Sequence, residues 1–273
     1  MIQLICRQAQ TLKKFTDENL ASASFCWEYL IKNKEIKING KKTGQDVLLH
    51  VGDVVSYYMT KKQEDRLGFC VVYEDENVCI IDKESGVNAG AVFAELSRKS
   101  GENVAFIHRL DRNTMGLMVF AKTTNAEREL LQAFKNRTVE KRYLALCVDN
   151  FPCEQDTLTA YLKKDEKCAH VRVYLEKAPD RERIITQYHV LEHRQDGTAL
   201  TEITLHTGKT HQIRAHMAFI GCHVIGDTKY GKAEYNKARN RTRQQLVAKY
   251  LTFQFEGGFS YLNGRTFISS YEL

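Results

Sequence analysis

The fold is organised around the sequence His108-Arg109-Leu110-Asp111-Arg112-Asn113-Thr114-Met115-Gly116-Leu117-Met118-Val119-Phe120-Ala121-Lys122. Its acid, Asp111, lies between Arg109 and Arg112, and nearby positive charge favours the ionised form of a carboxyl group. The run 117–121 is apolar at every position, which predicts a short strand buried on both faces. Asp111 is therefore expected on a loop just before a core strand, where functional groups are often held. The charge spacing alone favours a simple ion pair on the surface.

Length and composition indicate a soluble globular protein. A chain of 273 residues can bury a substantial core, in one large domain or two of modest size. The net charge of +6 suits a polyanionic partner such as nucleic acid, provided that the basic residues cluster. No apolar run approaches the roughly 20 residues that span a bilayer. The opening segment 1–7 is too short and too quickly polar for a signal peptide, so we expect a cytoplasmic protein.

The cysteines and histidines give no metal signature. The eight cysteines are scattered without a C-x-x-C pair, which predicts free thiols and no structural zinc. On a helix, His211 and His216 are five positions apart, so they do not share a face as an i, i+4 pair of ligands would. For these two histidines and His206 we expect structural or RNA-contacting roles. No metal and no cofactor is predicted.

Residues 1–60 have the pattern of a small unit with its own elements. Two short helices are expected at 12–20 and 24–32, the second with Ser24 as its N-cap and with Phe25, Tyr29 and Leu30 available for burial. The segment 36–42 alternates like a strand and contains an Asn-Gly turn. A further apolar stretch at 47–51 and a strand from Val54 complete the unit.

The remainder of the chain is predicted to form a larger α+β domain. The charged segment 61–66 has no apolar residue and is the best linker candidate, which gives the boundaries 1–60, 61–67 (linker) and 68–273. Beyond it, strands outnumber helices and do not alternate with them regularly, so we expect a mixed, mainly antiparallel sheet. Strands are predicted at 70–73, 78–81, 104–107, 117–121, 143–148, 184–191 and 199–205, and helices at 92–98, 126–135 and 211–220.

The order of elements in 1–60 resembles the alpha-L RNA-binding domain, a small α/β module found in many RNA-modifying enzymes. The resemblance rests on the two helices, the strand and turn at 36–40, and Val51-Gly52-Asp53-Val54. It implies that Lys37, Lys41 and Lys42 bind RNA phosphates, which positions RNA without reading its sequence. A solvated lysine-rich surface is the alternative.

The stretch around Asp111 closely resembles the central motif of the RNA pseudouridine synthases of the RluA class. Three further segments match motifs of that family: Asp82-Lys83-Glu84-Ser85-Gly86, Glu140-Lys141-Arg142-Tyr143-Leu144-Ala145, and Thr207-Gly208-Lys209-Thr210-His211-Gln212-Ile213-Arg214-Ala215-His216 continued by Gly226-Asp227-Thr228-Lys229-Tyr230-Gly231. The family isomerises uridine to pseudouridine in RNA without metal or redox cofactor. The sequence departs from the family pattern at Glu84-Ser85, Met115, Cys222-His223 and Val247.

The resemblance implies a role for each matching residue. Asp111 would be the catalytic carboxylate, either as nucleophile on the sugar or as base at its 2′ carbon, and both roles remain open. Arg214 would pair with Asp111, and Tyr143 would stack on the uracil while its hydroxyl assists proton removal. Arg109 would enter the space that the flipped base leaves, or else form a salt bridge within the loop. Lys209 and His211 would contact RNA.

The sequence therefore predicts an enzyme that acts on RNA. Ribosomal RNA is the expected substrate, with transfer RNA as a further possibility, and the oligomeric state is not predicted. A non-catalytic RNA-binding or ribosome-assembly protein on the same fold is the alternative function. The intact Asp111, Tyr143 and Arg214 favour the enzyme.

Overall fold

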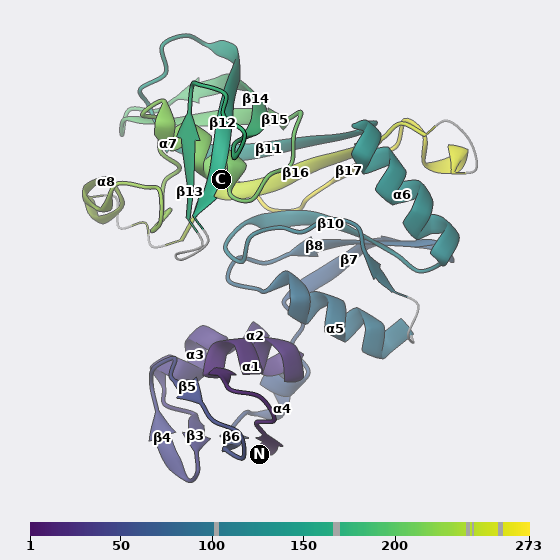
Figure 1. The fold of residues 1–273 in the computed structure, drawn as a ribbon, viewed down its shortest axis with the longest axis vertical. Helices are drawn as coiled ribbons and strands as arrows, with labels where there is room; N and C mark the ends of the chain where they lie inside the picture. The colour runs from purple at the N-terminus through teal and green to yellow at the C-terminus, as the bar shows by residue number, and fades with distance from the viewer. Residues whose placement is uncertain (101–103, 166–169, 239–240, 242, 256–258) are drawn as a thin grey trace.

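One mixed sheet of eleven strands builds the larger part of the protein (Figure 1). The computed structural model describes residues 1–100, 104–165, 170–238, 241, 243–255 and 259–273. Nine strands lie side by side in the order β13 (His170–Tyr174), β12 (Gln155–Asp165), β14 (Glu182–His193), β15 (Thr198–Leu205), β11 (Val139–Val148), β16 (Leu246–Phe253), β10 (Met115–Ala121), β8 (Val78–Lys83) and β7 (Phe69–Glu74). Two short strands complete the sheet, β9 (Ala105–Phe106) beside β10 and β17 (Thr266–Ile268) beside β16.

The pairing of strands confirms the predicted fold class. Among the described residues, β10 and β16 form a parallel pair and all other neighbours in this sheet are antiparallel. The helices of this part of the chain do not alternate regularly with the strands of the sheet, which agrees with an α+β fold. They are α5 (Ala89–Ser100), α6 (Thr124–Asn136), α7 (Gln212–Phe219) and α8 (Ala233–Ala238), with the 3-10 turn η1 (Ser260–Leu262) near the C-terminus.

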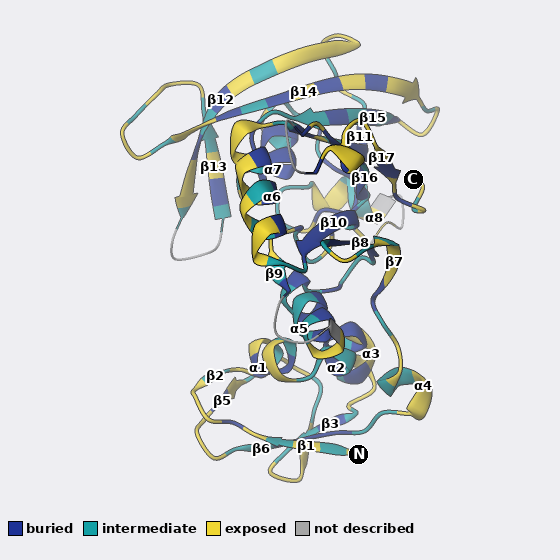
Figure 2. Ribbon diagram, turned by 90° about the vertical axis from the view of Figure 1, so that its right-hand side faces the viewer, coloured by how far each residue is buried: buried dark blue, intermediate teal, exposed yellow. Residues whose placement is uncertain are grey.

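Strand β10 is buried on both faces, as its apolar run predicts (Figure 2). Leu117 and Val119 belong to the apolar cluster that includes residues of α6. The alternate residues Met118 and Phe120 belong to the cluster that includes residues of α5. Because side chains alternate along a strand, one continuous apolar run serves both cores. This fixes the position of the loop that carries Asp111.

Gly116 is where β10 approaches β16 most closely. It has a φ of +109°, and a Cβ added there would lie 2.3 Å from the carbonyl oxygen of Ala248. No side chain fits this distance, so the parallel pairing of Gly116 with Ala248 depends on glycine. The strand after the Asp111 loop is therefore held by a close backbone contact.

Residues 2–57 form a separate unit, with a four-stranded sheet and its own apolar core. Its strands are ordered β1 (Ile2–Ile5), β6 (Val54–Tyr57), β3 (Ile36–Ile38) and β4 (Lys41–Thr43), and a small second sheet pairs β2 (Gln10–Thr11) with β5 (Leu48–Leu49). The expected Asn-Gly turn joins β3 to β4, with φ of 49° at Asn39 and 81° at Gly40. Helices α1 (Leu12–Asn19), α2 (Ala21–Phe25) and α3 (Trp27–Lys32) cover one side of the sheet, and α1 and α2 contact α5 (Figure 1).

Several local predictions were wrong. The helix predicted at 24–32 is two helices, and Ser24 lies inside α2, where its hydroxyl donates to Asp17 at 2.6 Å instead of capping a helix. Tyr29 is 51% exposed, whereas Phe25 and Leu30 are buried as expected. The charged segment that follows Thr60 is a short helix, α4 (Lys61–Glu64), with a capping box formed by Thr60 and Gln63.

The strands β1, β2, β12, β13, β16 and β17 were not predicted. β12 has mostly exposed or half-buried residues, so it lacks the apolar alternation that identifies a strand in sequence. Seven cysteines are free thiols, and Cys168 lies outside the described residues. In the part of the chain that the structure describes, no group of three or more side chains could hold a metal ion. The helices described there include none long and apolar enough to cross a membrane.

Candidate active site

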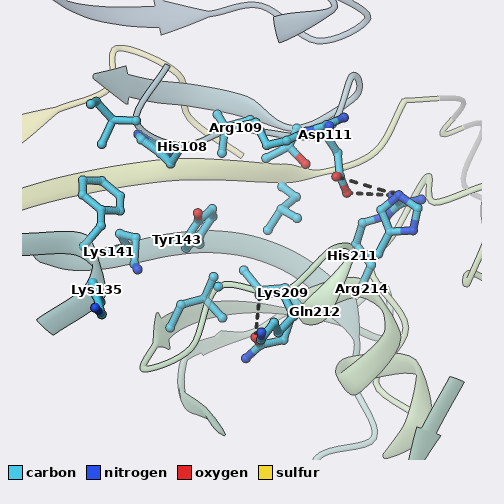
Figure 3. A pocket seen from close by; sticks show the side chains of 18 residues that line it. His108, Arg109, Asp111, Lys135, Lys141, Tyr143, Lys209, His211, Gln212 and Arg214 are labelled. Carbon is cyan, nitrogen blue, oxygen red and sulfur yellow. Dashed lines mark hydrogen bonds and ion pairs between the residues drawn. The ribbon is translucent and has the colours of Figure 1, made fainter. Parts of the chain in front are cut away.

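A cavity of about 420 Å³ lies between the Asp111 loop, β11 and the start of α7 (Figure 3). Six of the nine predicted site residues line it: Arg109, Asp111, Tyr143, Lys209, His211 and Arg214. The other three, Lys37, Lys41 and Lys42, do not line it and belong to strands β3 and β4 of the N-terminal sheet. Residues more than one hundred positions apart in the sequence are thus gathered at one site.

The Asp111 loop is fixed to the end of β8 by a buried lysine. The ammonium group of Lys83 donates to the carbonyl oxygens of Glu84 (2.9 Å), Val87 (3.1 Å) and Arg112 (3.0 Å). Burial, together with the nearby charge of Arg112, lowers the pKa of Lys83 to about 7. The Gly86 amide also donates to the Arg112 carbonyl at 3.0 Å. These bonds hold the backbone of the residue that follows Asp111.

Arg214 joins two carboxylates. Its Nη1 donates to Asp111 at 2.8 Å, while its Nε and Nη2 donate to Asp227 at 2.7 and 2.9 Å. Burial opposes the charge of Arg214, but the bonds to Asp227 and Asp111 raise its pKa, so it stays protonated. Burial likewise opposes ionisation of Asp227, yet Arg214 and two backbone amides lower the pKa of that carboxyl. Asp227 thus fixes one edge of the guanidinium, and the other edge donates to Asp111.

His211 adds a second nitrogen near Asp111. Its Nε2 lies 3.8 Å from an oxygen of Asp111, and its Nδ1 is 2.9 Å from the Tyr230 hydroxyl. Burial lowers the pKa of His211, so the imidazole is neutral at neutral pH. The Tyr230 hydroxyl accepts a bond from the Val171 amide, so it is free to donate its own proton to Nδ1. That arrangement leaves the proton of His211 on Nε2, facing Asp111.

The loop before α7 is held by Gln212, whose side chain is buried. Its oxygen accepts bonds from the Thr207 hydroxyl (2.8 Å) and the Lys209 amide (3.1 Å). Its nitrogen donates to the Ile185 carbonyl and the Thr186 hydroxyl. His211, the residue before Gln212, has a φ of +54°, a conformation that costs free energy in a residue other than glycine. The network around Gln212 stabilises this turn.

Tyr143 lies in the wall of the cavity because of an irregularity in β11. The register with β16 shifts between Arg142 and Tyr143, and such a bulge redirects a side chain. Tyr143 is 7% exposed. Burial, and then the charge of Asp111, raise the pKa of Tyr143, so its hydroxyl is protonated at neutral pH. The aromatic ring therefore offers the cavity a flat apolar surface with a hydrogen-bond donor at its edge.

The end of the cavity away from Asp111 is cationic (Figure 3). The ammonium of Lys141 lies 5.3 Å from the centre of the Phe134 ring, and burial lowers its pKa. Among the described side chains, no acid lies within ion-pair distance of Lys141. His108 stacks on Phe134 at 4.8 Å and accepts a bond from the Val119 amide. Burial lowers the pKa of His108 to about 3, which keeps it neutral.

The site residues that were not predicted individually include Lys83, Lys141, Asp227 and Tyr230. All four lie inside the sequence motifs that carried the family resemblance. Their positions in these motifs were the available signal, but their partners could not be read from the sequence.

Two departures from the family pattern occur at one place. Met115 and Val247 are register partners in the parallel pairing of β10 with β16. Neither side chain lines the cavity, whereas their neighbours Thr114 and Leu246 do. His223 receives a different role, since its Nδ1 lies 2.7 Å from the carbonyl oxygen of Tyr230. These departures thus leave the contacts of Asp111, Tyr143 and Arg214 intact.

The geometry suits chemistry on a planar base attached to an anionic chain. The Asp111 carboxylate is 23% exposed, so one of its sides is open to a substrate while Arg214 fixes the other. The ring of Tyr143 lies in the wall of the same cavity, which Lys135, Lys141 and Lys209 also line. A nucleotide has this combination of a flat ring, a sugar and a phosphate.

Comparisons with known proteins agree with this chemistry. The model of the RNA pseudouridylate synthase family matches residues 56–219, more than half of the chain. The ribosomal large subunit pseudouridine synthase D of Vibrio cholerae is 31% identical over 272 residues, covering 88% of this chain and 80% of the relative. Synthase C of the same organism is 30% identical over 233 residues, covering 76% of this chain and 72% of the relative.

A solved structure shares the fold. The human RNA pseudouridylate synthase domain containing 1 aligns with a TM-score of 0.59 and 24% identity, covering 74% of this chain and 91% of the human one. The sequence relatives carry the assignment of function, and the structural neighbour agrees with the fold. The chain belongs to the RNA pseudouridylate synthase family, in its RluA class, and is an enzyme that isomerises uridine to pseudouridine in RNA.

Proposed function

We propose that Asp111 is the catalytic carboxylate of this synthase and that ribosomal RNA is its substrate. The observation that carries the proposal is the bond from Arg214 to Asp111 at 2.8 Å, with Arg214 itself fixed by Asp227. A guanidinium held in this way stabilises a carboxylate and orients it without moving during the reaction. Asp111 then presents its open side to the sugar of a bound uridine.

The reaction requires that the N-glycosidic bond break and that a carbon–carbon bond replace it. The bond between N1 of uracil and C1′ of ribose is cleaved, the base turns, and its C5 joins C1′. The proton on C5 is lost and N1 gains one, so the product is an isomer of the substrate. Asp111 can begin this sequence by attacking C1′ or by removing the proton from C2′. Both routes require the ionised carboxylate that Arg214 stabilises.

Tyr143 is proposed to stack on the uracil. Its ring forms part of the cavity wall, and its hydroxyl is held protonated because burial raises its pKa. A protonated phenol can donate a hydrogen bond to a uracil oxygen, and it can relay a proton from C5 only if it gives up its own at the same time. We therefore assign stacking to the ring and a relay or hydrogen-bonding role to the hydroxyl.

Access to the target requires base flipping, since a stacked uridine cannot reach the cavity. Arg109 is exposed at the rim, next to Leu110 and Asp111, and its planar guanidinium can fill the space that the base leaves. Lys209 and His211 line the same cavity and are proposed to contact the RNA. Lys209 pairs with Glu182 at the surface, an exposed contact that an RNA phosphate can replace.

Residues 1–60 are proposed to be an RNA-binding domain, joined by 61–67 to a catalytic domain of residues 68–273. The separate sheet and the separate apolar core of the N-terminal unit support this division. Lys41 and Lys42 are exposed on β4, and Lys37 lies 4.7 Å from the ring of Tyr58. These three lysines are proposed to bind phosphates away from the active site, which tethers a long RNA. A ribosomal substrate of this kind fits a cytoplasmic enzyme.

Pseudouridine mapping of cellular RNA tests the proposal. Cells with the wild-type gene are compared with a deletion strain and with strains carrying Asp111→Asn or, as the matched control, the exposed Asp65→Asn. We expect at least one ribosomal site that is lost in the deletion and in Asp111→Asn but kept in Asp65→Asn. A site that persists in Asp111→Asn would contradict the role of the carboxylate. A site found only in transfer RNA would contradict the proposed substrate.

A further inference from the structure

Helix α1 of the N-terminal unit makes a direct contact with the Asp111 loop. The carboxylate of Asp17, on α1, forms an ion pair and hydrogen bond with the guanidinium of Arg112. The same carboxylate accepts bonds from the Asn88 amide at 3.1 Å and from the Ser24 hydroxyl at 2.6 Å. Asp17 therefore links its own unit to two segments of the larger one, the loop of Arg112 and the segment before α5.

Arg112 is bound through both its side chain and its backbone. Its Nη1 donates to the Gly86 carbonyl at 3.1 Å, while its own carbonyl accepts bonds from the Gly86 amide and the Lys83 ammonium. Arg112 directly follows Asp111, and the Thr114 amide donates to the Asp111 carbonyl at 3.1 Å to close the turn. Any shift of Arg112 therefore changes the position of the Asp111 carboxylate.

The contact is shielded from water, and the Asp17 carboxylate faces two cations. The side chain of Asp17 is 11% exposed and that of Arg112 is 23% exposed. The ammonium of Lys13 lies 3.9 Å from the same carboxylate, and burial, with the nearby charge of Arg112, lowers its pKa to about 8. The carboxylate of Asp17 thus compensates the charges of two cations, Lys13 and Arg112. Without the negative charge of Asp17, Lys13 would repel Arg112 and favour movement of the loop.

We propose that Asp17 and Arg112 are positioning residues, through which the N-terminal unit holds the Asp111 loop in its catalytic geometry. The inference rests on the proposed role of Asp111. It gives residues 1–60 a part in the chemical step in addition to any part in RNA binding. A unit that only tethered RNA would affect the apparent affinity and leave the rate at saturating RNA unchanged. The contact with Arg112 requires an effect on that rate.

The experiment measures kcat and KM of the full-length enzyme on an RNA that contains the mapped target uridine. Asp17→Asn keeps the shape of the side chain and removes its charge, and Glu18→Gln, next to it on α1 and 50% exposed, is the matched control. We expect Asp17→Asn to lower kcat by roughly ten- to a hundredfold with KM changed less than about threefold, because small displacements of a reacting group are costly. Glu18→Gln should keep the wild-type kcat.

Three further variants make the result specific. Arg112→Gln should lower kcat by a similar factor, and the double variant with Asp17→Asn should be no slower than Arg112→Gln alone, since both changes remove the same contact. Asp17→Glu should recover part of the rate. Multiplicative effects of the two single changes, or a wild-type kcat in Asp17→Asn, would overturn the inference.

The outcome can be separated from that of the proposed function. A wild-type kcat in Asp17→Asn together with an inactive Asp111→Asn would overturn the inference alone, whereas an active Asp111→Asn would contradict the proposed function itself. Thermal unfolding checks that each variant is folded. If Asp17→Asn is unfolded, Ser24→Ala decides, because it removes one bond to Asp17 without changing charge. A fall in its kcat at unchanged KM supports the inference, and an unchanged kcat overturns it.

Discussion

Asp227→Asn is the most informative test of how the active site is held together. The substitution keeps the size of the side chain but places an amide where a carboxylate accepts two bonds from Arg214. The side chains are 1% and 9% exposed, so the charge of Arg214 would lose its closest partner in a site shielded from water. Removing one partner of a buried ion pair costs about 3–5 kcal/mol. For a domain of this size, that corresponds to a melting temperature lower by roughly 6–20 °C.

The loss of stability in Asp227→Asn is expected to depend on pH. Although burial opposes its ionisation, Arg214 and the backbone amides lower the pKa of Asp227 in the folded protein. Its contribution to stability is therefore fully present above the unfolded-state pKa of about 3.9 and is lost as the pH falls through the lower folded-state value. The difference between wild type and Asp227→Asn should be largest near neutral pH and should shrink below about pH 4.

Calorimetry or urea unfolding at several pH values measures this difference, and the RNA turnover assay is run in parallel. Asp180→Asn is the matched control, because Asp180 forms an ion pair with Lys163 in which both side chains are about half exposed, and exposed ion pairs contribute little to stability. Turnover should fall together with stability in Asp227→Asn, since Arg214 also orients Asp111. A melting temperature within about 2 °C of wild type, with unchanged turnover, would refute this account of the site.

Three further predictions follow from the contacts and burial of individual residues. Tyr143→Phe should bind RNA with nearly wild-type affinity but turn over about a hundredfold more slowly, and equal turnover would exclude its hydroxyl from proton transfer. Gly116→Ala should lower the free energy of unfolding by about 3 kcal/mol, because its Cβ would meet the backbone of Ala248; an unchanged urea midpoint would contradict this. Burial lowers the pKa of His108 to about 3 and that of His216 to about 4, so the unfolded chain binds protons below about pH 6.5 that the folded protein does not. Stability should therefore fall by up to about 2.7 kcal/mol per pH unit between pH 6 and 5, and a flat profile there in urea titrations would count against neutral buried histidines.

Local patterns in the sequence predicted the parts of the fold that depend on local physics. The apolar run 117–121 predicted a strand buried on both faces, and Asn39-Gly40 predicted a hairpin turn. By contrast, β12 has few buried residues, and its place in the sheet comes from pairing with β13 and β14. Backbone pairing with neighbouring strands leaves no periodic apolar pattern in the sequence, so this strand was not predicted.

In the candidate site, too, the residues were predictable from the sequence, whereas most contacts between them depend on the tertiary structure. The motifs contained Asp111, Tyr143 and Arg214, and the fold brings all three to one cavity. The family resemblance implied the pairing of Arg214 with Asp111. The other partners, such as Asp227 for Arg214, were not predicted, because a carboxylate in a sequence does not reveal which cation it will meet. Asp17 and Arg112 are 95 positions apart, and their contact depends on how two separate sheets are arranged. Such contacts require the tertiary structure.

Release of tritium from RNA labelled at C5 of uridine tests the central claim most directly. Joining C5 to C1′ expels the C5 hydrogen to water, so the assay follows the chemical step itself. We expect folded Asp111→Asn to bind the RNA but to release no tritium above background, while wild type and Asp65→Asn release it at equal rates. Release by Asp111→Asn at the wild-type rate would contradict the assignment of Asp111 as the catalytic carboxylate.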